Sequence, residues 1–257
     1  MSQGPDAATS LSALVEPRWR FEFKYRIPVH AYHRIRAMIR PEMCADAHAS
    51  RGARGRYHVQ SLYFDTHDNR LFHEKQAGDT NRIKLRLRTY REHPSPEERV
   101  NFELKLRRGD ASGKVVGVGR YGDVRRVLRD GPEGAVTDPA VVEFVRQIHL
   151  QQLEPKVITR YEREAYVART GEELRVTFDH DVRSAYAHRL GDVGPFVRMH
   201  HRGWLVMEVK STEEQPGWMS RVIRELGLRV LANSKFTQAL LASRHELHHA
   251  TGIVAIR

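Results

Sequence analysis

Three segments of the chain alternate basic and apolar residues so regularly that each is predicted to be a β-strand. In RIKLRLRTY (82–90), positions 82, 84, 86 and 88 are basic, whereas Ile83, Leu85 and Leu87 are apolar. RWRFEFKYR (18–26) and NFELKLRR (101–108) show the same period of two, with single glutamates among the cations. Successive side chains of a strand point to opposite faces, so each of these strands has a charged face and an apolar face.

The charged faces of these strands constrain the fold. For any single strand, a solvated sheet face is the simplest interpretation. Several strands with the same bias instead favour an α+β fold in which a closed antiparallel β-barrel is flanked by helices that cover the apolar faces. Closure removes exposed strand edges and gathers the cations in a lumen. Because crowded cations repel one another, such a lumen is expected to bind a polyanion.

The remaining elements are read from periodicity and helix signals. A helix should follow Pro28 to about residue 40, and a strand at 58–66 should end in a polar turn at 67–69. Further helices are expected at about 138–152, 218–227 and 234–247, and further strands at about 155–168, 174–182 and 203–210. No linker divides the chain, so we expect one domain (17–249) between a disordered N-terminal tail (1–16) and a C-terminal tail (250–257).

Composition narrows the cellular setting and the partner. The net charge of +11 calls for an anionic partner. The single cysteine, Cys44, rules out an internal disulfide and suits a reducing compartment. No apolar run approaches the ~18 residues of a membrane span, and the N-terminus lacks the features of a signal peptide. We therefore expect a cytoplasmic protein without a membrane span.

One glycine-rich segment matches the sequence patterns of two nucleotide-binding motifs but not their structural context. GVGRYGDV (117–124) fits both the kinase glycine-rich loop and the dinucleotide fingerprint. The other kinase motifs are missing, and the segment follows antiparallel-looking strands in place of opening a βαβ unit. We interpret it as a flexible glycine loop.

Nine short motifs, in their order and spacing, resemble the VTC domain of polyphosphate polymerases, a branch of the triphosphate tunnel metalloenzymes. They are FEFKY (21–25), SLYFDT (61–66), KLRLRTY (84–90), FELKLR (102–107), RYEREAY (160–166), LRVTFDHDVR (174–183), MEVKS (207–211), PGWM (216–219) and NSKFTQAL (233–240). The resemblance runs from about Phe21 to Leu241 and implies a closed antiparallel barrel whose inward residues bind triphosphate and a divalent metal.

The resemblance also implies roles for individual residues. Its phosphate-binding positions are Lys24, Arg86, Arg88, Lys105, Arg163, Arg175 and Lys235, with Lys210 on the strand face of Glu208. Glu208 is the metal-ligand position for Mn²⁺ or Mg²⁺, and Glu103 is a secondary candidate. We expect Arg86, Arg88, Lys105 and Glu208 to be catalytic.

Two positions depart from the simple pattern. The family often has Lys-x-Arg after the fourth strand, whereas Val118-Gly119-Arg120 keeps only the arginine as a substrate-binding candidate. Alternation from Lys156 would place Arg160, not Arg163, on the charged face, so we expect a bulge near Tyr161.

Three functions fit these features. The first is metal-dependent polyphosphate synthesis, in which the γ-phosphate of ATP is transferred to a growing polyphosphate chain inside the tunnel. The second is a triphosphatase that hydrolyses tripolyphosphate or nucleoside triphosphates on the same fold. The third is a non-enzymatic polyanion binder, for which nucleic acid is disfavoured because the aromatic residues of the alternating strands lie on the opposite face from the cations.

Overall fold

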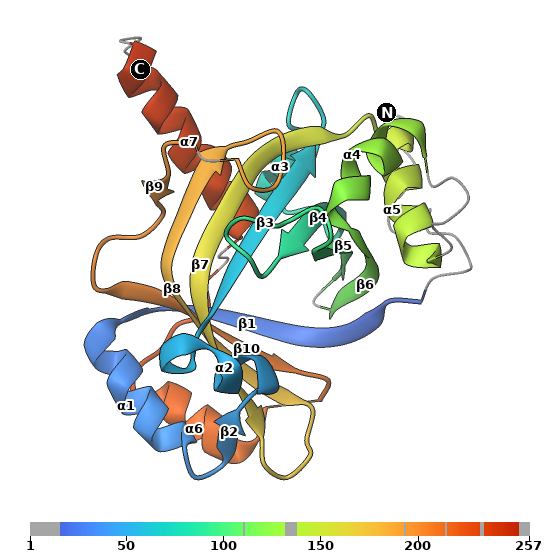
Figure 1. Ribbon diagram of the computed structural model, residues 1–257. Helices are drawn as coiled ribbons and strands as arrows, with labels where there is room; N and C mark the ends of the chain where they lie inside the picture. Colours follow the sequence, from blue (N-terminus) through green and yellow to red (C-terminus); the bar gives the residue numbers. More distant parts are fainter. Residues whose placement is uncertain are drawn as a thin grey trace.

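The computed structural model describes residues 16–109, 111–131, 138–192, 194–213, 215–231 and 234–251. Within these residues, eight antiparallel strands close a barrel in the order β7-β3-β4-β5-β6-β1-β10-β8, and β8 pairs back with β7 (Figure 1). The barrel strands are β1 (Arg18–Pro28), β3 (Tyr57–Asp65), β4 (Asn81–Thr89), β5 (Arg99–Arg108), β6 (Ala111–Arg120), β7 (Glu154–Ala168), β8 (Leu174–Tyr186) and β10 (Trp204–Ser211). Two short strands, β2 (Met43–Ala45) and β9 (Val197–Arg198), pair with β7 and β8. The predicted closed barrel is confirmed.

Helices cover the outward apolar faces, as the alternation requires. Leu85 of β4 and Leu104 of β5 are fully buried in one core together with Phe144 of α5 (Pro139–Leu150). Phe102 and Phe144 meet edge to face with ring centroids 5.3 Å apart. Burying a leucine side chain in this way stabilises the fold by about 1.5–3 kcal/mol. The apolar half of the alternation therefore holds the barrel wall against its helices.

A second core lies on another side of the barrel. It contains Ile35 of α1 (Val29–Ile39) and Met219 of α6 (Gly217–Glu225), packed against β1, β8 and β10. These two helices lie together, apart from α5 and α4 (Tyr121–Asp130) (Figure 1). The last helix, α7 (Lys235–Thr251), contacts β7 and β8 and buries Phe236 against Tyr63.

The predicted glycine loop is wrong, because the segment is strand β6 followed by α4. Its glycines are explained by close packing. A Cβ at Gly117 would lie 2.6 Å from a methyl group of Val141 in α5, and one at Gly119 would lie 2.9 Å from the Phe102 ring. The small residues therefore let α5 and the neighbouring strand approach β6 directly. The glycines that suggested a loop therefore lie on the outward face of a strand.

The end of β3 is also more structured than predicted. Beyond the turn at 67–69 the chain forms α3 (Arg70–Ala77). The buried carboxylate of Asp65 accepts hydrogen bonds from the backbone N–H groups of Leu71 (2.8 Å) and Phe72 (3.0 Å). Those donors have no partner within the helix, so Asp65 stabilises its first turn.

The other predicted helices and strands are found, with ends shifted by a few residues. Most of the two predicted tails, 1–16 and 250–257, lies outside the described residues. None of the helices in the described ranges has both the length and the apolar character needed to cross a membrane.

Candidate functional site

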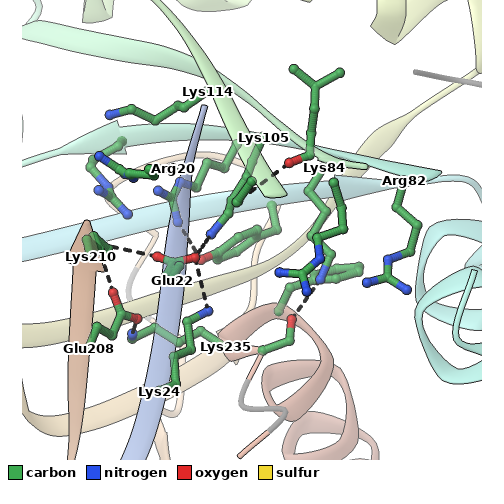
Figure 2. Close-up of a pocket in the computed structure, with 18 of the residues that line it drawn as sticks. Arg20, Glu22, Lys24, Arg82, Lys84, Lys105, Lys114, Glu208, Lys210 and Lys235 are labelled. Atoms are coloured by element: carbon green, nitrogen blue, oxygen red, sulfur yellow. Dashed lines mark hydrogen bonds and ion pairs between the residues drawn. The ribbon is translucent and has the colours of Figure 1, made fainter. Parts of the chain in front are cut away.

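The barrel lumen holds a cavity of about 450 Å³ with a strongly basic wall (Figure 2). Nine residues predicted from the sequence line it, namely Lys24, Arg86, Arg88, Lys105, Arg163, Arg175, Glu208, Lys210 and Lys235. They come from six different strands and α7, so only closure of the barrel brings them together. Of the predicted site residues, Arg120 and Glu103 are not part of the lining.

The inward face of β4 forms a row of cations along the cavity. Lys84, Arg86 and Arg88 alternate with the buried leucines of the same strand. The Lys84 ammonium donates to the Ser234 hydroxyl (2.8 Å), and Arg86 donates to the Tyr63 hydroxyl (3.1 Å). Fixed guanidinium and ammonium groups at regular intervals match the phosphate oxygens of a linear polyanion.

Glu103 is the counterion of this row. It is 1% exposed, and its oxygens lie 2.6 Å from Arg86, 3.7 Å from Arg88 and 3.9 Å from Lys114. Burial alone would raise the pKa of the Glu103 carboxyl, but these cations hold it well below its ordinary value. The predicted role of Glu103 as a second metal ligand is not supported by this position, because its carboxylate does not line the cavity.

Glu22 of β1, not Glu103, lies beside Glu208. The Lys210 ammonium is shared between them, 2.9 Å from Glu208 Oε2 and 3.4 Å from Glu22 Oε1. Glu22 also pairs with Lys105 and lies 3.7 Å from Lys24. Burial would raise the pKa values of both carboxyls, but the surrounding lysines keep them well below the ordinary range, so both are anionic.

The amine between these carboxylates is poorly stabilised as a cation. Burial lowers the pKa of Lys210 to about 7, although Glu208 and Glu22 oppose the effect. Lys235 behaves in the opposite way. Its ammonium lies 2.5 Å from Asp179 and 2.8 Å from Glu208, and these carboxylates outweigh burial and raise its pKa. Lys235 is therefore a permanent cation in the cavity wall.

The predicted bulge in β7 is confirmed. The register between β7 and β8 shifts between Arg160 and Glu162, which places Tyr161 and Arg163 on the lumen side. Arg163 then makes a two-pronged contact with Asp179 at 2.6 and 2.8 Å. Arg160 lies outside the cavity, where its guanidinium stacks over Phe196 at 3.9 Å. The extra residue of the bulge therefore places Arg163 in the lumen and leaves Arg160 outside it.

Arg120 does not reach the cavity. It is the last residue of β6, six positions beyond the lumen-lining Lys114, and its side chain is 60% exposed. There it pairs with Glu97 (3.1 Å) and Asp123 (3.2 Å). A strand rises about 3.3 Å per residue, so Arg120 is some 20 Å further along β6 than Lys114.

Several lining residues were not predicted from the sequence. Arg20 and Glu22 share the alternating face of Lys24, so their signal was present but not used. Lys114 lies just before the segment interpreted as a glycine loop, in a stretch where no strand was predicted. Four tyrosines also line the lumen, namely Tyr57, Tyr63, Tyr90 and Tyr161. Tyr90 corrects the expectation for the alternating strands, because it lies on the same side as the cations of β4.

The two lumen carboxylates fit a divalent cation. Glu22 and Glu208 offer hard anionic oxygens on either side of one ammonium. The described residues contain no group of three or more His, Cys, Asp or Glu side chains that could hold an ion alone. Mg²⁺ is commonly bound by one or two carboxylates and completed by water and substrate phosphates, which agrees with such a sparse donor set.

Comparisons with solved structures find chains that are similar to this one. A structure from Bacillus halodurans, described as a candidate adenylate cyclase, has a TM-score of 0.52 at 14% identity, covering 86% of this chain and 96% of that chain. A candidate adenylyl cyclase from Hippeastrum, described as having a dominant triphosphatase activity, has a TM-score of 0.48 at 15% identity, covering 87% and 96%. No curated protein matches the chain in sequence.

The first of these structures shows the fold alone, which is the triphosphate tunnel fold that the sequence predicted. The family is identified independently, by a model that describes the VTC domain and matches residues 19–244. Because this match spans most of the 257 residues, the chain belongs to the VTC domain family.

Proposed function

We propose that this protein is a metal-dependent polyphosphate polymerase that transfers the γ-phosphoryl group of ATP to the end of a polyphosphate chain. The observation that carries the proposal is the closed lumen, in which rows of fixed cations run past two anionic carboxylates. Membership of the VTC domain family supports the polymerase over other reactions of the fold.

The cations would position the triphosphate. Arg86 and Arg88 on β4 and Lys105 on β5 lie along one wall, and Arg163, Arg175 and Lys235 are contributed by β7, β8 and α7. The guanidinium groups of Arg86 and Arg163 are anchored by Glu103 and Asp179, so they are held in place before the substrate arrives. Such preorganised charge stabilises the phosphoryl group in the transition state, where positioning and electrostatics supply most of the rate enhancement.

The transfer itself needs no general base. The terminal oxygen of a polyphosphate chain is already anionic, so it can attack the γ-phosphorus directly. One P–O bond forms at this oxygen, the bond to the β,γ-bridging oxygen breaks, and ADP leaves with the electron pair. The protein must hold the attacking and leaving oxygens in line and exclude water from the same position.

Glu22 and Glu208 would hold Mn²⁺ or Mg²⁺. When bound, the ion supplies positive charge to the β- and γ-phosphate oxygens. Binding requires that the Lys210 ammonium move from between the two carboxylates or lose its proton, and its pKa of about 7 makes the neutral amine accessible.

Hydrolysis of triphosphates is the second candidate, and β1 carries the observation that favours it. The hydrolytic CYTH branch of the tunnel enzymes, which this chain resembles less, usually has Glu-x-Glu-x-Lys in the first strand. Here Glu22 and Lys24 occupy the last two of those positions and face the lumen, whereas Arg20 occupies the first. Water would then replace the polyphosphate end as the acceptor.

Product analysis distinguishes the two reactions. Purified protein is incubated with ATP and Mn²⁺ or Mg²⁺, and the products are separated on a gel that resolves polyphosphate. We expect polymer and ADP in molar balance, no product in EDTA, and loss of both products in Arg88→Ala but not in Arg120→Ala. Orthophosphate without polymer at every ATP concentration would assign the protein to hydrolysis.

A further inference from the structure

Three aromatic rings gather at one mouth of the cavity. They are His48 of α2 (Ala47–Arg51), Tyr57 of β3 and Tyr90, which follows β4 directly. His48 and Tyr90 are stacked, with centroids 5.8 Å apart and planes inclined by 14°. Tyr57 lies 5.8 Å from His48 and 5.9 Å from Tyr90. Tyr57 and Tyr90 also line the cavity, so the ring cluster belongs to its wall.

The cluster is not covered by the rest of the described structure. Tyr90 is 40% exposed and His48 is also exposed. Other exposed aromatic side chains, such as Phe21 (39%), Tyr186 (38%) and Trp204 (41%), do not line the cavity. Three rings in mutual contact, two of them in the wall of a basic cavity, instead offer a stacking surface to a ligand with a flat, unsaturated group.

The rings are fixed next to predicted phosphate-binding cations. Tyr90 is two residues beyond Arg88 and continues the inward face of β4. Arg175 donates to the Tyr57 hydroxyl (3.2 Å) and also contacts the carboxylate of Asp46. Asp46 in turn accepts from the Ala49 backbone N–H (2.7 Å) and so caps the helix that carries His48. Arg175 therefore ties the ring cluster to the basic wall.

The opposite end of β4 has a different character. Arg82 lies there, opposite Arg107 in the β-sheet and close enough to Lys75 for the two charges to repel. The cavity thus has an aromatic mouth and a cationic mouth, separated by the row Lys84, Arg86 and Arg88. A ligand with a ring at one end and phosphates along the rest matches this order.

We propose that His48, Tyr57 and Tyr90 form a nucleobase subsite, where the base of a nucleoside triphosphate stacks while its phosphates extend past Arg88 and Arg175 into the lumen. The inference rests on the proposed function for its substrate class and adds the place and direction of binding. Stacking on aromatic rings is tolerant of base identity, because every base has a π face. The donor is therefore a nucleoside triphosphate with little preference among bases, entering by the aromatic mouth.

The test compares a ligand that has a base with one that lacks it. Binding of ATP and of tripolyphosphate is measured by calorimetry in EDTA, where neither is expected to be turned over. We expect Tyr90→Ala to weaken ATP binding roughly 5- to 150-fold, which corresponds to the ~1–3 kcal/mol that removal of a stacking aromatic costs per base. Tripolyphosphate binding should stay unchanged, and Tyr90→Phe should restore ATP binding because it keeps the ring.

Tyr186→Ala serves as the matched control, because Tyr186 is similarly exposed (38%) but does not line the cavity. The proposed subsite would be overturned if Tyr90→Ala weakened the binding of both ligands equally. It would also be overturned if neither Tyr90→Ala nor His48→Ala changed ATP binding. The binding comparison does not depend on which product the protein makes. A protein that hydrolyses ATP without making polymer would contradict the polymerase and leave this test intact.

Discussion

Arg86 on β4 and Glu103 on β5 are direct cross-strand partners, and both Nε and Nη2 of the arginine lie 2.6 Å from one carboxylate oxygen. The carboxylate is almost completely buried, and burial would lower the pKa of the Arg86 guanidinium. Glu103 instead raises that pKa well above its ordinary value. The pair therefore has two consequences. It fixes a lumen cation in position, and it makes that cation necessary for the stability of the empty barrel.

Arg86→Ala should reduce stability as well as activity. Removing one partner of a buried ion pair typically costs 3–5 kcal/mol, and because Arg88 and Lys114 remain near Glu103 we expect a loss of about 3 kcal/mol. Loss of the transition-state contact should reduce kcat/KM by roughly 30- to 1,000-fold. Urea denaturation monitored by circular dichroism measures the first effect, and ATP turnover measures the second.

The double variant Arg86→Ala/Glu103→Ala provides the control. The double variant removes the buried carboxylate together with its main cation. It should therefore regain part of the lost stability but none of the lost activity. If Arg86→Ala were as stable as the original protein, the ion pair would not support the barrel.

Alternation alone predicts the opposite result for stability. A reading of RIKLRLRTY gives a row of like charges, so removal of one of them should relieve repulsion. The period of two correctly places the arginines in the lumen, but strand pairing is a long-range property that no single segment encodes. The register that sets Glu103 opposite Arg86 exists only after β4 and β5 have paired. For the same reason Glu103, and not Glu22, was the sequence-based choice for a second metal ligand.

The fold was more predictable than the details of the site. Strongly periodic strands and amphipathic helices were found because their patterns are local. β6 was missed because glycines occupy most of its outward positions and let neighbouring elements approach, so its apolar alternation is weak. Tyr90 was overlooked although it shares the parity of Arg88, because the adjacent rings of His48 and Tyr57 come from distant parts of the chain. Arg120 was misplaced because a short motif does not show where the lumen ends.

The two lumen carboxylates should control the metal requirement. Glu208→Gln and Glu22→Gln remove a negative oxygen donor while keeping the shape of the side chain. We expect the Mn²⁺ concentration for half-maximal activity to rise about tenfold or more, equivalent to at least about 1.4 kcal/mol. Electron paramagnetic resonance of free Mn²⁺, titrated with the protein in the absence of phosphate compounds, measures the Mn²⁺ affinity without turnover.

Glu103→Gln is the matched comparison, since it changes a third buried carboxylate of the barrel. Its effect should be on stability, with little change in Mn²⁺ affinity. A variant series in which Glu103→Gln weakens Mn²⁺ binding and Glu22→Gln does not would reverse our assignment of the second carboxylate.

ATP binding should be accompanied by proton uptake at pH 8.5. In the free protein, burial lowers the pKa of Lys114 to about 8, and burial and neighbouring cations also hold the pKa of Lys84 well below its ordinary value. Because the pKa of Lys114 in the folded protein lies below the unfolded-state value of about 10.4, the charged form of Lys114 destabilises the fold. This cost is fully present below a pH of about 8 and falls as the pH rises toward about 10.4. A bound phosphate stabilises the Lys114 ammonium and raises its pKa, so the lysine takes up a proton at pH 8.5.

Isothermal titration calorimetry in two buffers of different ionisation enthalpy measures this uptake, because the phosphates of ATP are already ionised at pH 8.5. In EDTA, Lys114→Met should take up fewer protons than the unchanged protein. Binding enthalpies that do not depend on the buffer would show that these lysines are already fully charged before the substrate binds.

The cationic mouth should determine how long the polymer remains bound. Burial and the charges of Arg82 and Arg107 lower the pKa of Lys75, so these cations repel one another in the empty protein. A triphosphate held at the aromatic mouth would extend along β4 past Arg88 and Arg86, whereas a long polyphosphate would also reach Arg82. Removing the two partly exposed cations in Lys75→Ala/Arg82→Ala should therefore weaken the binding of a polyphosphate of tens of residues about tenfold. Each lost contact contributes ~0.7 kcal/mol, and the two together correspond to that factor.

ATP binding in EDTA should change far less, thermal stability should hold or rise as repulsion is relieved, and the polymer made from ATP should become shorter. Arg120→Ala is the control, because it removes an exposed arginine that lies outside the cavity. The salt dependence gives a second measurement, since fewer phosphate contacts mean a shallower fall of log affinity with log salt concentration. If the double variant weakens ATP as much as polyphosphate, the triphosphate itself lies at this mouth and the direction of the chain through the barrel is the reverse of the one proposed.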